Sequence, residues 1–135
     1  MHFIICRKKG RQEYEKSRTL SPAGSFDALR SAVQNGCDAV YLGGMMFGAR
    51  AFANNFDEEE LKKAVAYAHI YGVRVFVTVN TLLYEEELET FKEYAIKLQE
   101  ADVDALIVQD IGSFCVVERV ASRYGTSCFY ADAHP

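Results

Sequence analysis

The chain has 135 residues, half of them hydrophobic, and a formal net charge of −4 at pH 7. This length and composition predict one domain with a core of its own, and the acidic balance argues against a general nucleic-acid-binding surface. No apolar run approaches the roughly 20 residues that span a bilayer, and the apolar stretch at the start is too short for a signal peptide. We therefore expect a cytoplasmic chain without a membrane partner.

Apolar residues recur along the chain with two alternating periods, one typical of helices and one typical of buried strands. The predicted elements are a weak strand at 18–24, a helix at 25–36, a strand at 38–42, a helix at 57–72, a strand at 73–79, a helix at 85–101, a strand at 104–110 and a helix at 111–125. Asp57 and Glu60 have the spacing of a capping box, which predicts where the second helix begins. Apolar strands that alternate with helices indicate βα units on a parallel sheet.

Four such units form either a small open sheet or half of an eight-unit barrel, which needs roughly 250 residues. Each predicted strand ends in small or polar residues, and this register favours the half barrel. We predict an α/β fold of four βα units with parallel strands, resembling the first half of a TIM-like (β/α)8 barrel. A half barrel leaves two edge strands unpaired and its inner face uncovered, so we expect self-association through the open edges.

A glycine-rich loop follows the strand at 38–42. Its sequence, GGMMFGARAFANN, lacks the lysine and hydroxyl of a P-loop and the spacing of a dinucleotide-binding fingerprint. Its apolar residues suggest that it folds onto the mouth of the barrel. Arg50, the one cation of the loop, either pairs with an anionic group of a ligand or bonds to nearby backbone.

Polar side chains also follow the next two strands. Asn80 and Thr81 suit the orientation of a polar ligand by hydrogen bonds, or else form an ordinary turn. Gln109 and Asp110 end the strand after that. Asp110 is the one carboxylate at a predicted strand end, so it is the candidate for acid–base catalysis, although capping of the following helix is the more common role.

For the other ionisable residues and the cysteines, the sequence predicts structural roles. His69 falls inside a predicted helix, away from the strand ends. The acidic run at 85–87 opens a helix and complements its dipole. The four cysteines show no CxxC spacing, and we expect Cys37 and Cys115 to be buried thiols instead of metal ligands.

Four long segments resemble the start of the collagenase-like peptidase family U32: SPAGSFDALRSAVQNGCDAVYLGG, FGARAFANNF, VFVTVNTLLYEEEL and DALIVQDIG. The resemblance covers about residues 20–112. It implies a TIM-like barrel and an activity that is either peptide hydrolysis or oxygen-independent hydroxylation of tRNA, rRNA or the ubiquinone ring. It implies ligand binding at the strand ends, by Ser21, Gly24, Gly43, Gly44, Arg50, Asn80, Thr81 and Gln109, with Asp110 as the candidate catalytic residue.

Some relatives carry an iron–sulfur cluster, but this chain lacks the downstream cysteines that bind it, so we expect no cofactor here. The ends also depart from the family. Residues 1–17 look like an unmatched extension, and the tail at 125–135 stands where the family continues as HASTQMH. One permitted back-translation of SCFYADAHP encodes HASTQMH after a shift of one base, so we expect a frame-shifted tail.

The partial barrel domain would then be 18–124. Such a fragment is expected to be inactive alone, and RNA would be a partner only of a full-length parent. The alternative is a stand-alone small α/β module that binds an unknown ligand, possibly as a homodimer of half barrels.

Overall fold

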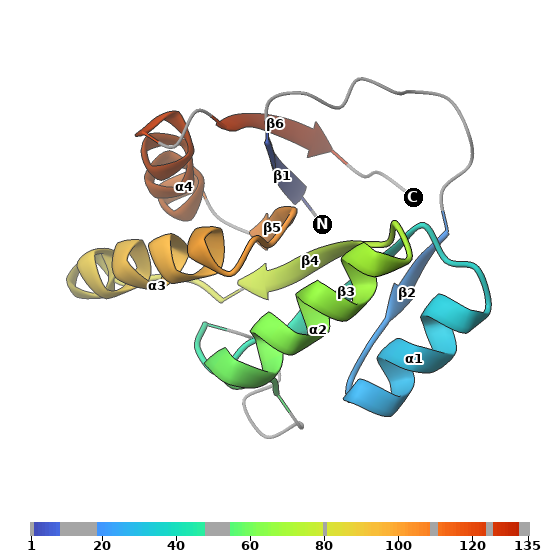
Figure 1. Cartoon of the computed structure of the whole chain (residues 1–135). Helices are drawn as coiled ribbons and strands as arrows, with labels where there is room; N and C mark the ends of the chain where they lie inside the picture. Colours follow the sequence, from blue (N-terminus) through green and yellow to red (C-terminus); the bar gives the residue numbers. More distant parts are fainter. Residues whose placement is uncertain are drawn as a thin grey trace.

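A computed structural model describes residues 2–8, 19–47, 55–79, 81–108, 111–123 and 126–132. The elements, drawn in Figure 1, are β1 (His2–Lys8), β2 (Leu20–Pro22), α1 (Phe26–Gln34), β3 (Ala39–Gly43), α2 (Glu58–Ile70), β4 (Arg74–Val79), the 3-10 helix η1 (Glu85–Glu87), α3 (Leu88–Glu100), β5 (Ala105–Val108), α4 (Ile111–Arg123) and β6 (Thr126–Asp132). Every helix and strand predicted from the periodicity is present. The acidic run at 85–87 forms a 3-10 turn that leads into α3.

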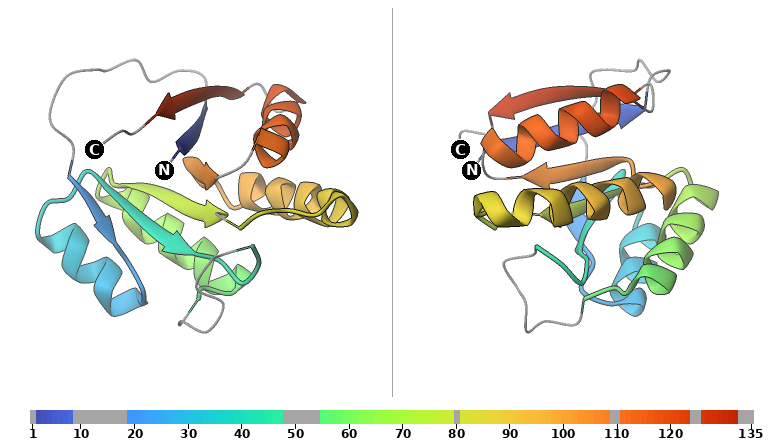
Figure 2. Two further views of the ribbon diagram at one scale, coloured as in Figure 1. Left: turned by 180° about the vertical axis from the view of Figure 1, so that it is seen from behind. Right: turned by 90° about the vertical axis from the view of Figure 1, so that its left-hand side faces the viewer.

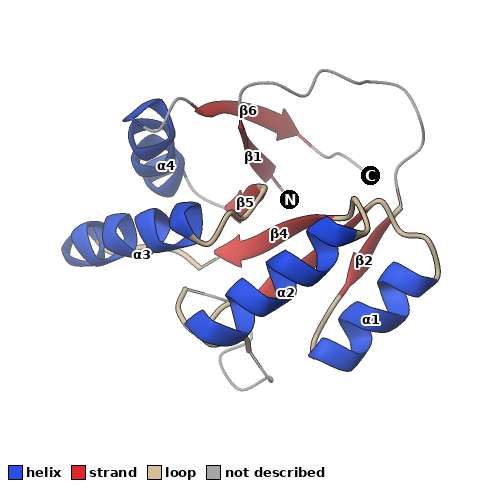
Figure 3. Cartoon of the chain, viewed as in Figure 1, coloured by secondary structure: helices blue, strands red, loops and turns tan. Residues whose placement is uncertain are grey.

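Four strands form a parallel sheet in the order β2-β3-β4-β5. Each is followed by a helix, so the α/β prediction of four βα units is confirmed, as Figure 3 shows by element type. Because each strand pairs in parallel with the next, all four carboxyl ends lie at one edge of the sheet. We call this edge the mouth.

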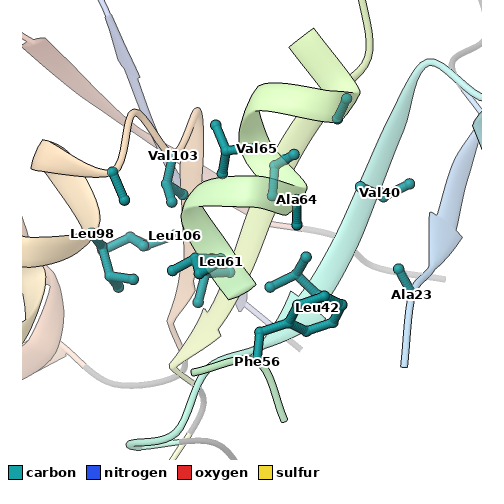
Figure 4. Packing of buried hydrophobic residues seen from close by; sticks show 14 of the residues in the cluster. Ala23, Val40, Leu42, Phe56, Leu61, Ala64, Val65, Leu98, Val103 and Leu106 are labelled. Atoms are coloured by element: carbon teal, nitrogen blue, oxygen red, sulfur yellow. The ribbon is translucent and has the colours of Figure 1, made fainter. Parts of the chain in front are cut away.

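The two faces of the sheet differ in what covers them. Val40, Leu42, Val75 and Val77 are at most 2% exposed, and they pack against the helices. Figure 4 shows Val40 and Leu42 beside Leu61 and Ala64 of α2, together with other residues of the same buried cluster. Residues that alternate with these valines and leucines face the other way, because strand side chains point to opposite faces in turn. We call that side the helix-free face.

Local signals in the sequence account for the helix ends. The Asp57 carboxylate accepts from the backbone N–H of Glu60 at 2.7 Å, and the Glu60 carboxylate accepts from the backbone N–H of Asp57 at 3.1 Å. This is the predicted capping box. Gly72 follows α2 with φ +70°, a conformation that favours glycine.

His69 ties together three segments at the end of the sheet opposite the mouth. Its Nε2 lies 2.7 Å from the carboxylate of Asp104, which also accepts from the backbone N–H of Val75 at 2.8 Å. Its Nδ1 lies 3.4 Å from a carboxylate oxygen of Asp102. These contacts join α2, β4 and the turn before β5, in line with the structural role predicted for His69.

The first and last strands form a second sheet that the sequence reasoning did not predict. β1 pairs with β6 in antiparallel register along its whole length, from His2 opposite Asp132 to Lys8 opposite Thr126. β1 lies beside β5, as both views of Figure 2 show, without sharing a ladder with it. β2 and β5 are therefore the two edge strands of the parallel sheet, as expected, and self-association through these edges stays a prediction.

The chain ends thus form strands, whereas the periodicity had placed no element there. The division into an extension at 1–17, a barrel domain at 18–124 and a tail at 125–135 stays a prediction. Among the described residues, no helix has the length and apolar content needed to cross a membrane.

Candidate functional site

The mouth is the candidate site because parallel α/β sheets bind ligands at the carboxyl ends of their strands. Of the residues predicted there, Arg50, Asn80, Gln109 and Asp110 lie outside the described residues, and their roles stay predictions. The other predicted residues, Ser21, Gly24, Gly43, Gly44 and Thr81, are described.

Gly43 ends β3 on the helix-free face, where it pairs with Thr78 of β4. A methyl group at Gly43 would come within 2.7 Å of the side-chain oxygen of Asn55 and 3.8 Å of the hydroxyl oxygen of Thr78. Glycine at this position leaves room for the Asn55 amide to approach the strand. Thr78 also donates to the carbonyl of Leu42 at 3.3 Å.

Gly44 makes room on the opposite side of the strand. A methyl group there would collide with the phenol oxygen of Tyr94 from α3. Burial raises the pKa of Tyr94, and the backbone amide of Met46 opposes that rise in part. That amide does not reach hydrogen-bonding geometry, so the buried hydroxyl has no partner among the described residues. The two consecutive glycines thus receive one side chain each, from opposite faces.

Thr81 joins two loops of the mouth. Its hydroxyl, just past β4, donates to the backbone carbonyl of Phe47 at 3.0 Å. Phe47 has φ +58° and packs its ring between those of Phe91 and Tyr94, at centroid distances of 5.4 and 5.8 Å. Phe47 therefore folds back onto α3, whereas Met45 and Met46 of the same loop are exposed, so only part of the expected apolar packing is present. Thr81 thus holds the loop in place, and ligand binding by its hydroxyl stays a prediction.

Ser21 and Gly24 show no comparable constraint. Ser21 lies half-buried in β2, on the face that packs against the helices. A methyl group at Gly24 would meet nothing within 4 Å. The geometry gives no reason for a glycine at position 24.

Sequence reasoning missed Asn55, Thr78 and Tyr94. Thr78 is the polar residue on the helix-free face of an otherwise apolar stretch, VFVTV, and that exception was a usable signal. Asn55 precedes the buried Phe56, so alternation could have placed it on the helix-free face. Tyr94 gave no signal, because its contact with Gly44 joins residues far apart in the chain.

The two cysteines whose side chains are described, Cys37 and Cys115, do not converge on one site. Cys37 is buried after α1, and burial raises the pKa of its thiol. Cys115 is exposed on α4, so its predicted burial is wrong. Figures 1 and 2 place α1 and α4 at opposite ends of the molecule. These thiols do not fit an iron–sulfur cluster, and the part of the chain that is described holds no group of three metal-ligating side chains.

Comparison with known proteins shows that this chain matches the model of one protein family. The model of peptidase family U32 matches residues 24–126. A 23S rRNA 5-hydroxycytidine C2501 synthase of Escherichia coli strain K12 is 46% identical over 93 residues, which are 69% of this chain and 14% of that protein. The tRNA hydroxylation protein P1 of Bacillus subtilis strain 168 is 38% identical over 96 residues, 71% of this chain and 23% of that protein.

An uncharacterized protease of Methanocaldococcus jannaschii is 37% identical over 108 residues, 80% of this chain and 26% of that protein. This chain therefore spans about a quarter or less of the length of these three relatives. No solved structure matches it at a significant level.

Proposed function

This chain belongs to peptidase family U32, and from that premise we propose that it forms the first part of an enzyme that hydroxylates a nucleoside of tRNA or rRNA. The observation that carries the proposal is the layer of uncharged polar groups at the mouth, where the Asn55 amide and the Thr78 hydroxyl flank Gly43. Amides and hydroxyls orient neutral polar rings by hydrogen bonds. The names of two relatives, one acting on rRNA and one on tRNA, support the same class of substrate.

In this proposal the described residues bind and orient the substrate. The hydrogen bond between Thr81 and Phe47 keeps Phe47 packed against α3. The two glycines let the Asn55 amide and the Tyr94 ring approach the end of β3 closely. No step is assigned to an iron–sulfur cluster, because the described thiols of Cys37 and Cys115 lie in separate segments, after α1 and on α4. Acid–base roles for Asp110 and anion binding by Arg50 remain part of the proposal.

The activity would belong to a longer protein, since this chain corresponds to a small share of each relative. Four βα units supply half of the loops around a barrel mouth. We expect the isolated chain to hydroxylate no RNA by itself.

The test is made in the organism that encodes the chain. Its reading frame is deleted, and total tRNA and rRNA are digested to nucleosides and analysed by mass spectrometry. We expect one nucleoside with an additional oxygen atom to disappear from the deletion strain and to return when the intact locus is restored. An unchanged set of hydroxylated nucleosides would overturn the proposal.

Peptide hydrolysis is the second candidate, favoured by the family description and by the relative named as a protease. The same deletion strain separates the two activities. Loss of gelatin hydrolysis from the cell extract, with every hydroxylated nucleoside retained, would replace the first function with the second.

A further inference from the structure

Three aromatic rings and one guanidinium form a row on the outer surface of the helix layer. Phe26 of α1 packs against Tyr67 of α2 with ring centroids 5.5 Å apart, and Tyr67 packs against Tyr71 at 5.2 Å. The guanidinium of Arg30 lies over the ring of Phe26, 5.3 Å from its centroid. Because α1 and α2 lie side by side, as Figure 1 shows, the row crosses from one helix to the other. We call these four residues the aromatic row.

The aromatic row is open to solvent at both ends. Tyr71, which caps the end of α2, is 61% exposed, and Arg30 at the other end is exposed as well. Phe26 and Tyr67 between them are half-buried. The inner rings therefore fix the row against the protein, while the outer ring and the guanidinium are accessible to a partner.

Lys63 adds a second positive charge beside the row. It precedes Tyr67 by four residues and Tyr71 by eight, so the three side chains share one side of α2. The carboxylates of α2 are confined to its first turn, whereas the two tyrosines lie at its other end. On this helix, the row is therefore flanked by a cation and separated from the acidic turn.

Neither cation is neutralised within the described part of the chain. None of the ion pairs found there involves Arg30 or Lys63. Asp27 precedes Arg30 by three residues, but the guanidinium lies over the ring of Phe26 and forms no ion pair with this carboxylate. The row and Lys63 together thus complement an anionic partner.

Single-stranded RNA has the chemistry that fits such a surface. Its unpaired bases stack on aromatic rings and on arginine planes, and basic side chains nearby bind its phosphates. Interfaces between proteins, in contrast, keep charged residues away from their core. Here the two cations lie directly beside the exposed rings, which favours RNA over a protein partner.

We propose that the aromatic row and Lys63 bind unpaired nucleotides of the substrate RNA, with a base stacked on Tyr71 and phosphates on Arg30 and Lys63. The inference rests on the proposed function and adds a second RNA contact, on the outside of the helix layer and away from the mouth. An RNA substrate is large enough to reach both surfaces at once.

The direct test is a titration of the purified full chain with a fluorescein-labelled RNA of ten adenosines, followed by fluorescence anisotropy. Tyr71→Ala should weaken binding about tenfold, because one stacking contact is lost. Tyr84→Ala is the matched control, since Tyr84 is 79% exposed but lies at the start of η1 beside the mouth. Equal affinities of these two variants, or no binding by the unchanged chain, would overturn the proposal.

The charged contacts are tested by salt dependence. Arg30→Gln and Lys63→Gln should each reduce the slope of log Kd against log salt concentration by about 0.7, the effect of losing one phosphate contact on a single strand. Arg119→Gln is the control, because Arg119 is an exposed arginine of α4, at the opposite end of the molecule from α1. An equal reduction in all three variants, or in none, would contradict the assignment.

Two competitors test the other possible partners. If a peptide of ten glutamates displaces the labelled RNA as well as unlabelled RNA does, the row binds an acidic protein segment and the RNA assignment is wrong. If duplex RNA binds as tightly as the single strand, no base stacks on Tyr71 and the assignment is also wrong. We expect neither competitor to match the single strand.

A genomic variant separates this inference from the proposed function. The double substitution Arg30→Gln and Tyr71→Ala should lower the content of the hydroxylated nucleoside severalfold. Unchanged content in this variant, together with loss in the deletion strain, would show that the row is not used while the proposed function stands. If the row binds RNA as expected but the deletion strain keeps every hydroxylated nucleoside, the binding surface stands and the proposed function is wrong.

Discussion

The contact between Gly44 and Tyr94 shows how one glycine determines the packing of a helix. The phenol oxygen of Tyr94 occupies the space that a side chain at position 44 would fill. This hydroxyl is buried without a partner among the described residues, an arrangement that costs free energy of folding. The ring of Tyr94 nevertheless contributes by packing against Phe47, which belongs to the loop over the mouth.

The substitution Tyr94→Phe removes the buried hydroxyl and keeps the ring. We expect the free energy of unfolding to rise by about 1 kcal/mol at neutral pH, because no hydrogen bond is lost and a polar group leaves the interior. Chemical denaturation followed by circular dichroism measures this change. Tyr71→Phe is the control, since Tyr71 is 61% exposed and should change stability little.

The difference in stability between the unchanged chain and Tyr94→Phe should depend on pH. Burial raises the pKa of Tyr94, so the folded state keeps this proton at pH values where the unfolded chain has lost it. The contribution of Tyr94 to the free energy of unfolding is therefore constant below about pH 10. It falls as the pH rises above the ordinary pKa of tyrosine, because the unfolded chain then loses the proton first. The advantage of Tyr94→Phe should grow between about pH 10 and 11. A constant difference over that range would contradict the buried position of the hydroxyl.

At the scale of elements, the start of α2 connects the mouth loop to the helix layer. Its capping box supplies two hydrogen bonds between Asp57 and Glu60, and Glu58 adds ion pairs with Lys62 at 3.3 Å and Lys97 at 3.7 Å. All these groups are exposed, so the ion pairs contribute little. The cap is the stronger determinant of where the helix begins.

Asp57→Ala should lower the free energy of unfolding by about 1 kcal/mol, because the backbone N–H of Glu60 loses its acceptor. Urea denaturation gives the change as a lower midpoint with an unchanged slope. Glu59→Ala is the matched control in the same turn, and it should cost less than about 0.5 kcal/mol. Equal losses in the two variants would mean that charge near the helix end, and not the cap, provides the stabilisation.

At the scale of the whole molecule, the pairing of β1 with β6 brings the two ends of the described chain together. Residues directly opposite in an antiparallel pair have Cα atoms about 4.5–5.5 Å apart, within the range of roughly 4.4–6.8 Å found for disulfides. The register places Cys6 opposite Cys128. The arrangement of the two sheets therefore has a chemical test.

Oxidised glutathione should convert the Cys6 and Cys128 thiols into an intramolecular disulfide, with release of reduced glutathione. We expect peptide mass spectrometry to find this link in preference to any link with Cys37, which is buried. Closing a loop of about 120 residues should raise the free energy of unfolding by roughly 4–5 kcal/mol. Cys128→Ser is the control and should gain nothing from oxidation. Random pairing among the thiols would contradict the β1–β6 register.

The periodicity of the sequence determined the four βα units and their parallel order, because each segment buries one face or one stripe of its own residues. The cap of α2 and the turn at Gly72 were local as well, so residues close in the chain were sufficient to predict them. The glycine-rich loop after β3 was also visible in the sequence, although the side chains that lie against Gly43 and Gly44 were not.

Only the tertiary structure decided those partners, since Asn55, Thr78 and Tyr94 reach the glycines from other segments. The same reason explains β1 and β6: their pairing joins the two ends of the chain, and no local pattern carries information about a contact at that separation. Local periodicity therefore determined the elements of this protein, and long-range packing decided which side chains meet at its mouth.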